Sequence, residues 1–159
     1  MIALEAKIDA MARIILAETE GDRDSARSEL KNLLKKSRSR SQTELIHGVL
    51  KELGVPYGNL GHDYLVTAVK MVLEDPGLIN NITKSNGLYY KVAKEADTQP
   101  NRVERAIRHV IECMWNRGDC DILQHHFGNT VDPNKGKPTN TEAISCIAAI
   151  VRFRMEQGG

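Results

Sequence analysis

The chain has 159 residues, a net charge of +1 and a pI near 7.7, and no stretch approaches the roughly 18 consecutive apolar residues that a membrane span needs. Its three cysteines are few, and an odd number of them does not suit a secreted disulfide framework. Glu5 and Asp9 lie near the start of the chain, where a signal peptide would have a basic segment and then an apolar run. We therefore expect a cytoplasmic protein with no membrane contact, built as one globular domain with an appendage, whose cysteines mostly lie in the core.

The first 36 residues predict a helical hairpin. Apolar residues recur at helical spacing through Ile2–Thr19, and a second helix is expected over Asp24–Lys36. An apolar stripe of this length has to be covered, either by the rest of the domain or by a second copy of the chain. We favour the second copy, so residues 1–36 are a candidate dimerisation element.

The tract KKSRSRSQ, from Lys35 to Gln42, is basic and rich in serine. We interpret residues 37–41 as a linker between the hairpin and a domain that covers residues 42–159. Such a tract can contact phosphates non-specifically, but a solvated hinge is the more common use.

The rest of the chain predicts an all-α domain of about six helices, since no alternating strand pairs occur in it. Gly, Pro and Asp punctuate the pattern, and Thr139 with Glu142 three residues later forms a capping box that starts the last helix. The helices expected around the central motif are Thr43–Leu53, Gly61–Glu74, a short piece near Leu78–Ile82, Asp119–Phe127 and a last helix after Thr139.

Two helices and a tight turn within Leu88–Arg117 predict a helix-turn-helix. Ala93 is small where two helices would cross, Asp97 tolerates the left-handed conformation that the turn needs, and Pro100 suits the first turn of a new helix. The apolar stripe expected in the first helix is Tyr89, Val92, Ala93 and Ala96. In the second helix it is Val103, Ala106, Ile107, Val110, Ile111 and Met114, and Cys113 also lies on it.

The opposite face of the second helix carries charge. In helix-turn-helix proteins the start of this helix enters the major groove, where Arg can bind guanine O6 and N7 and Glu can accept from cytosine N4. Arg102, Glu104 and Arg105 are suitably placed readers. The alternative is a charged face that only contacts solvent.

The sequence gives little support for a metal site or a nucleotide-binding site. Four potential zinc ligands lie between residues 113 and 126, but their spacing matches no common zinc finger, and Gly136-Lys137 is followed by Pro138 where a phosphate-binding loop needs Ser or Thr. We therefore expect no metal, no cofactor and no enzymatic activity. Lys135 and Lys137 precede a helix N-terminus, a position that favours an anion such as a DNA phosphate.

The segment RVERAIRH at Arg102–His109, followed by Trp115, Arg117 and Gly118 and then by KPTN at Lys137–Asn140, resembles the DNA-binding effector domain of the response regulator that initiates sporulation. The resemblance runs from near Leu45 to near Arg152, roughly the last two thirds of the chain. The first forty residues lie outside it and have no room for a receiver domain, so we expect no phosphoacceptor control within this chain.

The resemblance implies roles for individual residues. Arg102, Glu104 and Arg105 would contact bases, and a sigma subunit of RNA polymerase would touch the segment Gly118–Val131, where only part of the family pattern is kept. The residues expected at the DNA backbone are Asn101, Arg108, Lys135 and Lys137.

The sequence therefore predicts a regulator of transcription that binds duplex DNA sequence-specifically. Homodimers could form through the N-terminal helices, or two copies could lie in tandem on DNA. The alternative is a protein without a receiver domain that pairs with a full-length regulator or another protein through its N-terminal helices.

Overall fold

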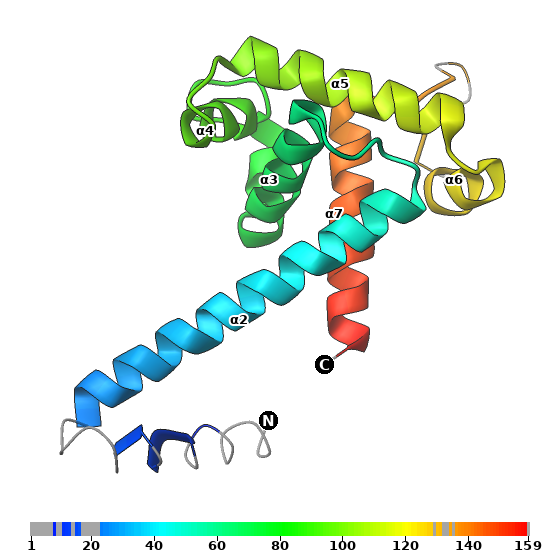
Figure 1. Cartoon of the computed structure of the whole chain (residues 1–159). Helices are drawn as coiled ribbons and strands as arrows, with labels where there is room; N and C mark the ends of the chain where they lie inside the picture. The colour runs from blue at the N-terminus through cyan, green and yellow to red at the C-terminus, as the bar shows by residue number, and fades with distance from the viewer. Residues whose placement is uncertain are drawn as a thin grey trace. The chain divides into compact units, whose positions relative to one another are not determined.

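The computed structural model describes residues 23–128, 130, 131, 134 and 136–158, together with residues 8, 11–13, 15 and 16. Helices and their connections account for these residues, with no strand among them, which confirms the all-α prediction (Figure 1). Within the same residues no helix is both long and apolar enough to cross a lipid bilayer.

The chain divides into two units, Met1–Ser41 and Gln42–Gly159. In the first unit, the described residues before position 17 are helical, and most of the segment predicted as the first arm of a hairpin lies outside the described residues. Ala26 and Leu30 are buried, whereas Leu33 is exposed. The hairpin and its pairing with a second copy therefore stay predictions.

Helix α2 spans Arg23–Glu52 without a break, so residues 37–41, predicted as a linker, are helical, and the two units divide within this helix after Ser41. The tract that suggested a hinge contains no glycine and no proline. Lysine and arginine are good helix formers, and serine is only moderately unfavourable, so nothing in the tract stops a helix that has already started. The predicted stop at the other end is confirmed, since α2 ends just before Gly54, whose φ of +81° places it in the left-handed region.

In the second unit, α3 (Leu60–Glu74) is the central element. Asn59 caps its start by accepting from the His62 backbone N–H at 2.9 Å, and α3 packs against α4, α5 and α7. Gly61 lets α3 approach α5 closely, because a Cβ at this position would lie 2.4 Å from the carbonyl oxygen of Ala106. A short 3₁₀ helix, η1 (Pro76–Asn81), follows α3 and leads towards α4 (Leu88–Glu95).

The remaining helices are α5 (Pro100–Arg117), α6 (Cys120–Phe127) and α7 (Asn140–Gln157). The predicted capping box at the start of α7 is confirmed, with Thr139 and Glu142 bonded to each other in both directions. Figure 1 shows α5 crossing the N-terminal end of α7, and Trp115 of α5 meets Phe127 of α6 edge to face with ring centroids 6.0 Å apart. One face of α5 thus packs against the core of this unit, and the opposite face is exposed to solvent.

Candidate nucleic-acid interface

Helices α4 and α5 form the predicted helix-turn-helix. The turn between them uses Asp97 at φ +49°, and the Thr98 backbone N–H donates to the Ala93 carbonyl at 2.9 Å, which closes the end of α4. Pro100 occupies the first turn of α5. The prediction that Asp97 takes the place usually given to glycine is therefore confirmed.

The apolar faces of this motif lie in the core. Val103, Ile107, Val110, Ile111 and Met114 of α5 are each no more than 1% exposed. Three members of the predicted stripes are less deeply buried than expected, because they lie at the edges of the packed faces. Ala96 is exposed at the C-cap of α4, and Ala106 and Cys113 are only partly buried.

The predicted base readers lie on the outer side of α5, in its first two turns. Arg102 and Arg105 are exposed, as is Asn101, which was predicted to contact the backbone. Glu104 is only one-third exposed, and its carboxylate forms an ion pair with Arg108 one turn further along the helix. The structure thus brings the three predicted readers to one end of one helix.

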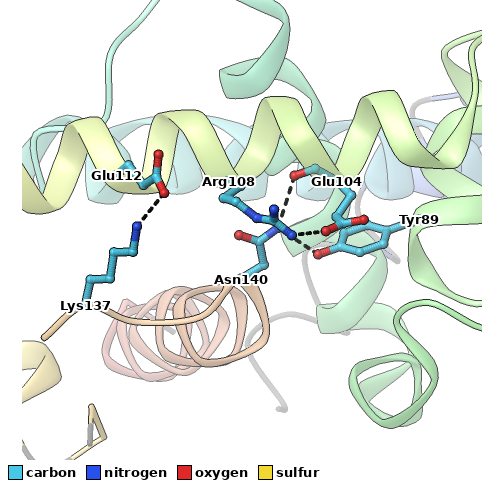
Figure 2. A network of polar contacts seen from close by, with 6 residues as sticks. All are labelled: Tyr89, Glu104, Arg108, Glu112, Lys137 and Asn140. Carbon is cyan, nitrogen blue, oxygen red and sulfur yellow. Dashed lines mark hydrogen bonds and ion pairs between the residues drawn. The ribbon is translucent and has the colours of Figure 1, made fainter. Parts of the chain in front are cut away.

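A polar network joins this face to the start of α7 (Figure 2). The Asn140 side-chain N–H donates to the Tyr89 hydroxyl at 2.8 Å and to the Glu104 carbonyl at 3.2 Å. Burial raises the pKa of Tyr89 above its ordinary value, so this hydroxyl stays protonated at neutral pH. Asn140 therefore connects α4, α5 and α7, a role that spacing within the sequence did not indicate.

Lys137 lies across a groove from Arg108. Its ammonium is 2.5 Å from a carboxylate oxygen of Glu112, and this contact holds the pKa of Glu112 below its ordinary value (Figure 2). The groove has a volume of about 410 Å³. Its polar and charged lining comes from Thr83, Tyr89, Glu104, Arg108, Glu112, Lys137, Thr139, Asn140 and Thr141.

The anion site predicted before α7 includes Lys135 and Lys137. Lys135 lies outside the described residues, so its predicted contact stays a prediction. At the start of α7, the Glu142 carboxylate already accepts the Thr139 backbone N–H at 2.7 Å. The expected anion site at this helix N-terminus is thus partly occupied by a side chain of the helix itself.

The segment predicted to touch a sigma subunit, Gly118–Val131, contains α6. Asp119 caps this helix by accepting from the backbone N–H groups of Asp121 and Ile122 at 2.9 and 3.1 Å. Leu123 and Phe127 are buried, and the outer residues of α6 are exposed. The contact with a sigma subunit stays a prediction.

The cysteines differ from the prediction that most of them lie in the core. Cys120 is exposed and the other two are partly buried, Cys113 with its Sγ 3.7 Å from His109 Nε2. Cys146 donates to the His126 carbonyl at 3.3 Å, and burial raises the pKa of its thiol. Among the described residues, no group of three or more His, Cys, Asp or Glu side chains is arranged to hold a metal ion.

A comparison with protein families agrees with this arrangement. The family model described as "Sporulation initiation factor Spo0A C terminal" matches residues 46–151. The match begins in the second unit within α2, contains the whole helix-turn-helix and reaches into α7. The chain therefore belongs to the Spo0A C-terminal family, the DNA-binding effector domains of the sporulation initiation factor.

Proposed function

We propose that this chain regulates transcription by binding duplex DNA sequence-specifically, with the start of α5 in the major groove. The observation that carries the proposal is the pair of faces on α5. One face is buried against the core, and the other presents Arg102 and Arg105 in the first two turns of a helix-turn-helix recognition helix. A rigid helix with exposed arginines at its N-terminal end has the geometry by which this motif reads bases.

The roles of the three readers follow from their chemistry. Each arginine can donate two hydrogen bonds to O6 and N7 of a guanine, and the Glu104 carboxylate can accept from N4 of a cytosine. Glu104 is the least accessible of the three and is paired with Arg108, so its orientation is set before DNA arrives. The first two turns of α5 thus offer two guanine readers and one cytosine reader.

Backbone contacts come from Asn101, Arg108, Lys135 and Lys137. Arg108 and Lys137 each hold a carboxylate partner in the free protein. A phosphate can replace these partners at little cost, because an ion pair at the protein surface contributes little to stability. These contacts fix the register of α5 on the duplex without reading its sequence.

Fluorescence anisotropy tests the proposal. The affinity of the whole chain for a duplex carrying the operator box of the family is compared with that for a scrambled duplex. We expect a preference for the box, and Arg105→Ala should reduce it by about 5- to 150-fold, which corresponds to about 1–3 kcal/mol for one bidentate arginine–guanine contact.

Arg117→Ala is the matched control. It removes the same charge from an exposed arginine in the last turn of the same helix. The preference for the box should be unchanged in this variant. Equal and weak binding of both duplexes by the wild type would sink the proposal and favour the alternative, in which the chain pairs with another protein through residues 1–36.

A further inference from the structure

Because α2 is a continuous helix, the side chains of its basic tract have defined directions. A hinge would leave these side chains without a common direction, whereas a helix turns by 100° per residue and places them on defined sides. Arg27, Lys31, Lys35 and Arg38 fall within an arc of roughly 80°, and they extend over about 16 Å of helix. All four are exposed.

Charge is concentrated in this part of the chain. Residues 23–41 contain seven Lys or Arg and two Asp or Glu, a net of +5 in a chain whose total is +1. Glu29 lies on the opposite side of the helix from these cations, roughly 200° around from Arg27. Asp24 lies on the same side but in the first turn, where the helix dipole favours a carboxylate, and it precedes the first of the four cations.

The spacing of these cations is unfavourable for an isolated helix. Arg27 and Lys31, and Lys31 and Lys35, are four residues apart, and like charges at this distance on a helix repel each other. Glutamates placed between them would have stabilised the helix. The arrangement becomes favourable when a polyanion lies along it, because each phosphate then faces a cation.

We propose that Arg27, Lys31, Lys35 and Arg38, here called the α2 stripe, form a second DNA-binding surface that contacts the phosphate backbone without reading sequence. Duplex DNA carries one charge for each 1.7 Å or so of its axis, so about 16 Å of helix faces many phosphates. The stripe and the second unit are parts of one chain, so binding of the second unit to DNA raises the effective concentration of the stripe at that DNA. This assignment goes beyond base reading by α5, since it predicts affinity for duplex of any sequence.

The dependence of affinity on salt measures this contribution. Each phosphate contact adds about 0.9 to the steepness of log K plotted against log salt concentration. For the whole chain on a scrambled duplex of 30 base pairs, Lys31→Gln/Lys35→Gln should reduce the steepness by about 1.8. Glutamine has nearly the helix propensity of lysine, so α2 should persist, and circular dichroism checks that it does.

Lys36→Gln/Lys51→Gln is the matched control. Both lysines are exposed on the same helix and the net charge changes by the same amount, but Lys36 lies roughly 140° around the helix from Lys31 and Lys51 belongs to the second unit. We expect this double variant to leave the steepness nearly unchanged. Equal changes in the two double variants, or no change in either, would overturn the α2 stripe as a DNA-binding surface.

Two further comparisons distinguish DNA binding by the stripe from base reading by α5 and from binding to a membrane. The ratio of affinities for box and scrambled duplex should be the same in wild type and Lys31→Gln/Lys35→Gln. A chain with no preference for the box but a reduced steepness would refute base reading by α5 and keep the stripe. The last comparison measures binding to vesicles that contain phosphatidylserine. If Lys31→Gln/Lys35→Gln lost binding to the vesicles but not to DNA, the stripe would be assigned to a membrane surface and the proposal would be overturned.

Discussion

The exposed face of α5 and the α2 stripe are both basic, but they are built in different ways. On the exposed face of α5, cations are interspersed with carboxylates. Arg108 and Lys137, which are proposed to contact the DNA backbone, each form an ion pair with a glutamate. On the α2 stripe, cations follow one another with no carboxylate between them. Reading bases needs a few side chains in fixed directions, which a packed core can supply, whereas attraction to a polyanion needs only the sum of the charges.

The largest effect should come from removing the core support of α5. Ile107 is 0% exposed and follows the proposed base readers on α5, so Ile107→Ala should lower the free energy of unfolding of the second unit by about 2–5 kcal/mol. Urea denaturation followed by the fluorescence of Trp115, the single tryptophan, measures this change. No substitution in the α2 stripe should approach it, because those side chains are exposed.

Leu60→Ala is the control for Ile107→Ala. Leu60 starts α3 and is 65% exposed, so its truncation should change the free energy of unfolding by less than about 0.5 kcal/mol. Similar losses in the two variants would contradict the view that burial, and not helix content, supports the recognition helix.

The recognition helix was largely predictable because two independent patterns agree in it. The period of its apolar residues fixes which side is buried, and Asp97 with Pro100 fixes where the turn lies, so the direction of Arg102 and Arg105 follows. α2 was predicted less well. Its basic tract has no apolar period to indicate a helix, and only the absence of Gly and Pro distinguishes a long helix from a hinge.

Contacts between distant segments could not be predicted at all. Asn140 and Tyr89 lie 51 residues apart, and Glu112 and Lys137 lie 25 apart, so no periodicity relates them. Their pairing depends on how α7 crosses α5, which is a property of the packed core. The sequence thus indicated which cations face outwards but not which of them a carboxylate already holds.

An intermediate effect is expected from pH. His62 is 2% exposed in the second unit, its ring stacks on His47 and meets Tyr57 edge to face, and burial is the main reason that its pKa lies below the ordinary value of 6.5. Asp63, with a carboxylate oxygen 3.6 Å from His62 Nδ1, opposes this shift without cancelling it. Because the unfolded chain binds the proton more readily, the free energy of unfolding should fall as pH drops below about 6.5 and be unaffected above it.

Denaturation at several pH values between 5 and 8 tests this expectation. His62→Gln should show a flatter dependence than wild type, whereas His125→Gln, at an exposed histidine of α6, should keep the wild-type dependence. An unchanged dependence in His62→Gln would assign the effect to other groups.

The smallest effect should come from substituting Glu112. This carboxylate pairs with a cation beside α5, whereas the α2 stripe has no carboxylate between its cations. The Glu112 carboxylate holds Lys137, and a phosphate has to displace it, so Glu112→Gln should raise the affinity for DNA slightly. Removing any negative charge near DNA could do the same, and Glu95→Gln, at an exposed glutamate of α4, measures that general effect. The gain from Glu112→Gln should exceed the gain from Glu95→Gln, and in a Lys137→Ala background it should fall to the size of the Glu95→Gln gain, because no lysine is left to release. A gain of equal size with and without Lys137 would mean that Glu112 repels the duplex directly, and the difference between the two basic surfaces would then reduce to net charge alone.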